Sequence, residues 1–348
     1  MNVVKKLAYG FALTCAALCA TGSFADTATD YVSESSGKAT IIDLGEQFAV
    51  VFSNEVSTAI TLTALKPCTL IRSLVVGGGG AGGSTLGGGG GGGQVKESFD
   101  LHAISANDVL TLTVGAGGAW GAGGFPAGLQ GGTSSLTLPN GTTINAYGGG
   151  GGGGFNAKAP TANAAGEIGS GGGNAYGYAT APTKGTHYNY GNPGGLGQGG
   201  GGGAGAAGEN RGLHAESVLY GDETKYRTQA GYGGEGVPSD ISGVNEIYGS
   251  GGGGGGGQDC WSQVHAPGGT HAGAGATRTD KKGGGDGNNN ALPADEGFGA
   301  GGGGGGFSQT GSSSYGGAPS KGGCGTVILR FSKRDLSKLL LEVDPIPD

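Results

Sequence analysis

Uninterrupted runs of glycine recur through this chain of 348 residues and limit the folds open to it. They occupy residues 77–80, 87–93, 148–154, 199–203, 251–257 and 301–306. Glycine has no Cβ, so ordering it costs more backbone entropy than ordering other residues, and a run of glycines offers no side chain to bury. Such runs either stay disordered or pack main chain directly against main chain.

The glycine-rich stretch is not a uniform linker. It holds 85 of the 89 glycines between Gly77 and Gly325, without the strict third-residue repeat that collagen requires. Apolar β-type runs interrupt it at residues 109–114, 134–138 and 142–147, and Pro139-Asn140-Gly141 between the last two is a strong hairpin signal. We therefore expect the region to be ordered; a disordered, gel-like chain is the alternative.

If the tracts are ordered, the extended threefold helix called polyglycine II suits them best. It has about three residues per turn, and its amide and carbonyl groups point away from the axis, so they must bond to neighbouring chains. Seven glycines would span roughly 20 Å in this form. The sequence therefore predicts a bundle of polyglycine II helices of similar length, connected by long polar loops.

Ordinary β sequence flanks the glycine-rich stretch on both sides. Before it, we expect strands at residues 40–43, 47–53, 58–65 and 68–76, because runs rich in Ile, Val, Thr and Leu are separated by turn residues. After it, the apolar run at 326–331 predicts a closing strand that pairs with the N-terminal set. Ser332 is expected to cap a short helix in the C-terminal tail.

The N-terminus is typical of a secretory signal peptide. Lys5 and Lys6 precede an apolar stretch at residues 7–20, and Ser23-Phe24-Ala25 fits a cleavage site before Asp26. Cleavage there lowers the formal charge from −7 to −9. Without a basic run or another long apolar segment, we expect an exported protein with no nucleic-acid partner and no transmembrane segment in the mature chain.

These signals divide the chain into four parts. They are a signal peptide (1–25), an N-terminal β segment (26–76), a glycine-rich domain with strands and loops (77–325), and a closing strand with a short C-terminal helix or tail (326–348). Three cysteines remain after cleavage: Cys68, Cys260 and Cys324. Export favours oxidation, so one disulfide between Cys68 and Cys324 is expected; three unpaired thiols are the alternative.

The order of these pieces resembles a known family. The residues that carry the resemblance are 74–83, 87–93, 112–118 and the closing segment 322–331. They are similar to the glycine-rich domain in the extracellular part of the anaplastic lymphoma kinase and leukocyte tyrosine kinase receptors and in bacterial and phage surface proteins. The resemblance implies a mainly β fold: a β-sandwich-like scaffold that carries a bundle of polyglycine helices. It also implies a binding function.

Aromatic side chains in the polar loops are the candidate ligand-binding residues, since tyrosine in glycine-rich loops is common at recognition surfaces. They are Tyr176, Tyr178, Tyr188, Tyr190, Tyr220, Tyr226, Tyr232, Tyr248 and Trp261. The alternative is that these rings only cover the ends of the bundle. Cys260, His265 and His271 form a weak candidate metal site, because their spacing fits no strong zinc pattern.

The sequence predicts a secreted or surface-exposed protein that acts in adhesion, ligand recognition or extracellular structure, with no cofactor and no catalysis. Its partner would be an extracellular protein or a glycan. Two alternatives stay open: a disordered matrix-like component, and a secreted enzyme whose site is assembled from the loops.

Overall fold

The computed structural model describes eleven segments of the chain. They are residues 26–53, 56–121, 126–155, 167–175, 191–211, 215–220, 223–228, 230–256, 266–274, 290–310 and 313–334. The predicted signal peptide and the predicted C-terminal helix therefore lie outside the described residues. Ser332, the expected helix cap, is instead the last residue of a strand.

Antiparallel strands make up the regular structure, which confirms the prediction of a mainly β fold. A five-stranded sheet has the order β1 (Val32–Glu34), β4 (Val56–Ala64), β8 (Val109–Val114), β9 (Ser134–Thr137), β10 (Thr143–Ala146). A six-stranded sheet has the order β2 (Thr40–Asp43), β3 (Gln47–Phe52), β17 (Thr326–Ser332), β5 (Cys68–Val76), β6 (Val95–Ser98), with β7 (His102–Ile104) also paired to β5. A short 3₁₀ helix, Ala28–Asp30, precedes β1.

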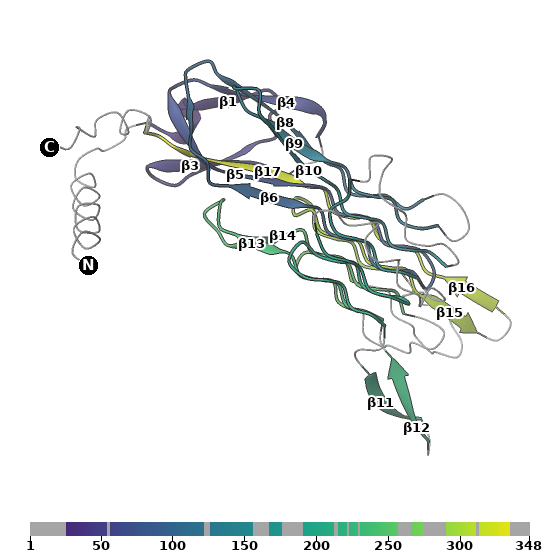
Figure 1. The fold of residues 1–348 in the computed structure, drawn as a ribbon. Coiled ribbons are helices and arrows are strands. Elements are labelled where there is room, and N and C mark those ends of the chain that lie inside the picture. The colour runs from purple at the N-terminus through teal and green to yellow at the C-terminus, as the bar shows by residue number, and fades with distance from the viewer. Residues whose placement is uncertain are drawn as a thin grey trace, which may run out of the picture.

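Three two-stranded ribbons complete the described strands. They are β11 (Ala215–Tyr220) with β12 (Glu223–Thr228), β13 (Val237–Ser239) with β14 (Glu246–Tyr248), and β15 (Phe307–Thr310) with β16 (Ser313–Gly316). The ribbon β13–β14 lies beside the six-stranded sheet, whereas β11–β12 and β15–β16 lie at the opposite end of the molecule (Figure 1).

The two large sheets share one hydrophobic core. Leu62, Leu112 and Leu136 from the five-stranded sheet and Phe48 and Phe331 from the six-stranded sheet belong to the same buried cluster. In β4 the buried residues alternate with the half-buried Thr61 and Thr63, as the period-two pattern predicts. The two sheets thus face each other and form a scaffold.

The closing strand β17 lies in the middle of the six-stranded sheet. It pairs with β3 on one side and with β5 on the other, which confirms that the end of the glycine-rich stretch returns to the N-terminal strands. Leu329 faces the core between the sheets, while Ile328 belongs to a second cluster on the opposite face, together with Ile241 and Tyr248. Burial on both faces explains why the strand is a continuous apolar run.

The predicted hairpin is also present. Strands β9 and β10 pair from Thr137–Thr143 to Ser134–Ala146, around the turn at Pro139-Asn140-Gly141. Gly141 has φ +84°, a left-handed conformation that glycine adopts without strain. Asn140 stabilises the turn further, because its side-chain oxygen accepts a hydrogen bond from Thr142 N at 2.9 Å.

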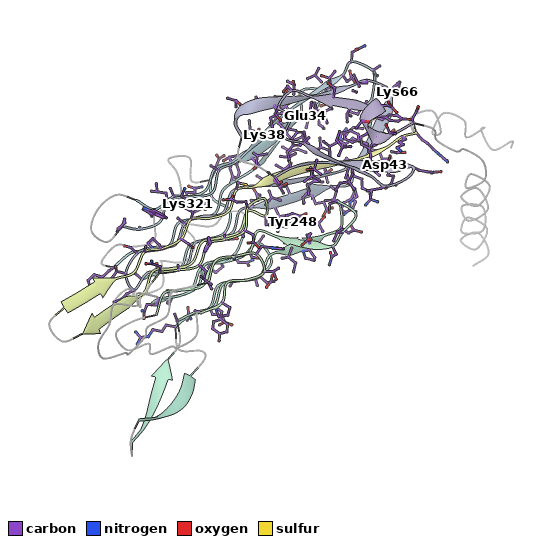
Figure 2. All side chains as sticks on the ribbon, turned by 180° about the vertical axis from the view of Figure 1, so that it is seen from behind. Glu34, Lys38, Asp43, Lys66, Tyr248 and Lys321 are labelled. Atoms are coloured by element: carbon purple, nitrogen blue, oxygen red, sulfur yellow. The ribbon has the colours of Figure 1, made fainter. Side chains whose placement is uncertain are left out.

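The glycine tracts are direct continuations of the scaffold strands. β5 ends at Val76, one residue before the first tract, and β6 begins at Val95, just after the second. β17 begins directly after Gly325. The tracts run side by side away from the sheets toward the ribbons β11–β12 and β15–β16 (Figure 1). Side chains crowd the scaffold, whereas the tracts carry few (Figure 2).

Residues 87–94, which we call the central tract, donate hydrogen bonds to three different segments in rotation. Amides 87, 90 and 93 donate to one segment, amides 88, 91 and 94 to a second, and amides 89 and 92 to a third, with N···O distances of 2.7–3.1 Å. The acceptors are Gly305, Gly302 and Gly299, then Gly153, Gly150 and Tyr147, then Gly199 and Gly202. The direction of bonding therefore repeats every third residue.

The carbonyls of the central tract accept hydrogen bonds from three further segments, at 2.8–3.0 Å. The donors are Gly77, Gly80 and Gly83, then Gly252 and Gly255, then Ser170 and Gly173. The central tract is thus bonded to six surrounding segments through the main chain alone. It is buried along its whole length, and these bonds satisfy the polar groups that burial would otherwise leave unpaired.

The spacing of the tracts leaves no room for side chains. A Cβ placed on Gly90 would lie 2.1 Å from Gly80 O, and one on Gly89 would lie 2.0 Å from Gly252 O. On Gly91 it would lie 2.2 Å from Ser170 O. Each of these contacts is with main-chain atoms that are themselves held by hydrogen bonds. The absence of Cβ atoms is therefore what allows the tracts to approach one another.

Candidate functional site

Most of the predicted aromatic binding residues lie outside the described residues. This applies to Tyr176, Tyr178, Tyr188, Tyr190 and Trp261. Tyr220 and Tyr226 lie in β11 and β12, and the structure places only their main chain. This ribbon stands at the end of the bundle opposite the scaffold (Figure 1).

Two tyrosines of this set are described with their side chains. Tyr232 is half-buried, and its carbonyl accepts a hydrogen bond from Glu209 N at 2.9 Å, so its main chain belongs to the bundle. Tyr248 is buried in the cluster on the outer face of the six-stranded sheet, with its ring 5.7 Å from that of Phe298. Burial raises the pKa of Tyr248 to about 12. Its expected place on a binding surface was therefore wrong: it is a core residue.

The predicted disulfide between Cys68 and Cys324 is not formed. Cys68 begins β5, and the antiparallel register pairs its neighbour Thr69 with Ser332, at the far end of β17 from Cys324. A disulfide needs Cα atoms within about 7 Å, and these cysteines lie at opposite ends of the same strand pair. Both are buried, and Cys324 Sγ donates a hydrogen bond to Ser53 O at 2.9 Å.

Of the candidate metal ligands, only His271 is described; Cys260 and His265 lie outside the described residues. The two ring nitrogens of His271 face two carboxylates, with Nδ1 3.1 Å from Asp295 Oδ2 and Nε2 3.2 Å from Glu246 Oε2. The ring stacks on Phe298 with 3.7 Å between centroids. Within the described part of the chain, no group of three His, Cys, Asp or Glu residues is arranged to hold a metal ion.

His271 instead connects three segments. The imidazole joins its own loop to β14 through Glu246 and to the segment before the tract at 301–306 through Asp295. The imidazole thus lies between two carboxylates and links the three segments.

Sequence reasoning missed a surface hollow on the flank of the bundle. It has a volume of about 390 Å³ and is formed where three segments meet. The lining residues are Trp120, Asn290, Ala291, Pro293, Ala294, Glu296, Ala318, Pro319, Ser320, Lys321 and Gly322. We call it the Trp120 groove. Lys321, at one edge, projects from the side of the bundle (Figure 2).

Main-chain and side-chain hydrogen bonds fix the walls of the Trp120 groove. Ala291 N donates to Ala318 O at 3.0 Å, and Gly322 N donates to Gly118 O at 3.1 Å. Asn290 Oδ1 accepts from Ala318 N at 2.9 Å. Glu296 Oε2 accepts from the amide of Cys324 at 2.6 Å. The three segments are thus held in one arrangement, while Trp120 remains 49 % exposed.

The comparison with protein families identifies the class of this chain. A glycine-rich domain model matches residues 54–332, which includes eight strands of the two large sheets and all the glycine tracts. The chain belongs to the glycine-rich domain family. A comparison with curated proteins found none that matches. Among the described residues, no helix is long and apolar enough to cross a membrane.

Proposed function

We propose that this is an exported, non-catalytic recognition protein in which polyglycine II helices form a rigid support for its loops. The observation that carries the proposal is the main-chain network of the central tract, which bonds to six neighbouring segments with a period of three residues. Threefold helices with outward-pointing amides account for both features. Strands would direct these bonds to two neighbours only.

The network supports a rigid molecule over the alternative of a gel-like matrix component. A chain whose buried amides are paired with specific partners has lost the conformational freedom that a gel requires. A rigid bundle would hold the segments that connect its tracts at a fixed distance from the scaffold. Loops carried on a rigid support are the usual place for binding residues. Recognition is therefore the function that this arrangement serves best.

The described residues offer little support for the enzyme alternative. The best candidate cluster, Cys260, His265 and His271, contributes one described residue, and both ring nitrogens of His271 already face carboxylates. The proposal also includes that the protein is exported, that its partner lies outside the cell and that it uses no cofactor. The acidic balance of the mature chain favours solubility outside the cell.

The test uses a quadruple variant of the exported protein in which serine replaces each of Tyr176, Tyr178, Tyr188 and Tyr190. Its binding to arrays of extracellular proteins and of glycans is measured beside that of the parent protein. The proposal expects that the parent protein binds at least one array member, and that the quadruple variant binds it at least about tenfold more weakly with an unchanged unfolding curve. A parent protein that binds nothing on either array contradicts the recognition function.

A further inference from the structure

The Trp120 groove combines one aromatic face with several hydrogen-bonding groups. Among the described residues that line it, Trp120 provides the only large apolar side chain; the other apolar residues are alanine and proline. A pocket for an aliphatic or aromatic peptide side chain would need a deeper apolar lining. A flat ring beside small, rigid walls fits instead a ligand that is itself flat on one face and polar at its edges.

The polar groups of the groove include donors and acceptors that the fold leaves available. Asn290 uses its oxygen for Ala318 N, which leaves its amide NH₂ as a double donor. Glu296 uses Oε2 for Cys324 N, which leaves Oε1 as an acceptor. Within the described part of the chain Lys321 has no ion pair, and it is exposed. The fold itself therefore orients a donor and an acceptor.

We infer that the Trp120 groove is a binding site for a glycan, with the less polar face of one sugar ring stacked on Trp120. Hydroxyl groups both donate and accept, so they match Glu296 Oε1 on one side and Asn290 Nδ2 and Lys321 Nζ on the other. A volume of about 390 Å³ lies near the lower end for small-molecule sites, so the groove accepts one or two rings of a longer chain. The inference rests on the proposed recognition function but assigns it a site apart from the tyrosine loops.

The sequence provides a direct reporter for this site, because the chain has only two tryptophans, Trp120 and Trp261. In the variant Trp261→Phe, Trp120 is the sole tryptophan, and in Trp120→Phe, Trp261 is the sole one. The probes are soluble tetrasaccharides of glucose, mannose, N-acetylglucosamine and galacturonic acid. Emission and acrylamide quenching are measured during titration of the full exported chain.

The inference expects a saturable change in Trp120 emission, with protection from acrylamide, for at least one tetrasaccharide. Lys321→Ala and Glu296→Gln should each weaken that binding about tenfold, since each removes a hydrogen bond involving a charged group. Gln at position 296 keeps an oxygen for the Cys324 amide, so it preserves the wall. Phe99→Ala, which truncates a 65 % exposed aromatic outside the groove, should leave binding unchanged.

Two results separate this inference from the proposed function. If none of the tetrasaccharides changes Trp120 emission, or if their binding survives Trp120→Ala at unchanged affinity, the groove is not a glycan site. A response confined to the Trp261 reporter would overturn the groove site while supporting recognition by the loops. If array ligands bind only through Trp120 and are unaffected by the tyrosine loop variant, the groove is supported and the loop assignment fails.

Discussion

At the scale of single residues, the missing Cβ atom is the basis of this architecture. Gly90 illustrates the point, because its amide bonds to Gly302, its carbonyl accepts from Gly252, and its Cα faces Gly80. Three separate tracts converge on one residue that has no side chain. Alanine directly follows the first tract at Ala81, which is fully buried, so a methyl group is accommodated at this position. The restriction is thus specific to positions and is not a general demand for glycine.

Gly90→Ala should destabilise the fold strongly. The new methyl carbon would lie 2.1 Å from Gly80 O, and overpacking of this kind costs about 1–3 kcal/mol or more. Gly121→Ala is the matched control, since its Cβ would approach no described atom closer than 3.0 Å. Urea unfolding measures both. Equal midpoints for the two variants would show that the tracts are not packed main chain against main chain.

Tyr248 should ionise at a higher pH than an ordinary tyrosine. Burial raises its pKa to about 12, so the folded state favours the neutral phenol and its contribution to stability is complete below pH 10. That contribution decreases as the pH rises from about 10 toward 12. The absorbance titration at alkaline pH, taken as the difference between the parent and Tyr248→Phe, measures it. A difference curve centred near pH 10 would mean that the ring is exposed.

At the scale of elements, the central strand β17 connects the two ends of the sequence. It fills the gap between β3 and β5, and its flanking residue Lys333 forms an ion pair with Asp43 at 3.0 Å. The side chain of Lys333 is 3 % exposed, so it relies on that carboxylate and on the carbonyl of Asp26, 3.1 Å away. Closure of the sheet thus involves both a strand pairing and a charge pairing.

The Asp43–Lys333 pair should make the free energy of unfolding depend on pH in the acid range. The hydrogen bond from Lys333 lowers the pKa of Asp43, so this carboxylate stabilises the fold above its ordinary pKa and stops doing so as the pH falls through the lowered value. Asp43→Asn removes the effect. The measurement is the midpoint of urea unfolding at pH 7 and near pH 2 for both proteins. A parent–variant difference that stays constant over this range would contradict the pairing.

Eight of the seventeen described strands, those with strong local patterns, were predictable from sequence to within a few residues. β2, β5 and β8 have the expected bounds, and the turn at Gly141 joins the expected arms. The Cys68–Cys324 disulfide was not predictable in the same way. Two cysteines that each precede an apolar run look equivalent along the chain, but antiparallel pairing of those runs places them at opposite ends.

The site was less predictable than the fold. The Trp120 groove is formed by segments almost 200 residues apart in sequence, and they meet only because the tracts place them side by side. Trp120 itself sits in a glycine-rich stretch without a recognisable motif. Tyr248 shows the opposite error: its composition suggested a loop, although it lies at the end of β14 and faces the sheet. Sequence pattern reports local structure, whereas these contacts are long-range.

At the scale of the whole molecule, two kinds of packing stabilise two different regions. The scaffold is held by a side-chain core between its sheets, and the bundle is held by main-chain hydrogen bonds. The strands pass from one region into the other without a break at β5, β6 and β17 (Figure 1). Because the two regions share continuous strands, we expect them to unfold together as one cooperative unit.

Export can be tested on the same scale. The chain should be secreted and cleaved after Ala25, because the small residues at positions 23 and 25 follow the apolar stretch. N-terminal sequencing of the exported protein should begin at Asp26. Replacing Ala25 with Arg, which removes the small residue before the cleavage point, should block processing. A mature protein that retains residues 1–25 would contradict the proposed signal peptide.

The most direct test of the architecture is residue-resolved amide hydrogen exchange of the exported protein. The account predicts that the amides of residues 87–94 exchange as slowly as those of β5 and β17, because each is buried and bonded to a defined carbonyl. Exchange through the central tract at the rate of an unprotected chain, while the scaffold strands stay protected, would contradict it.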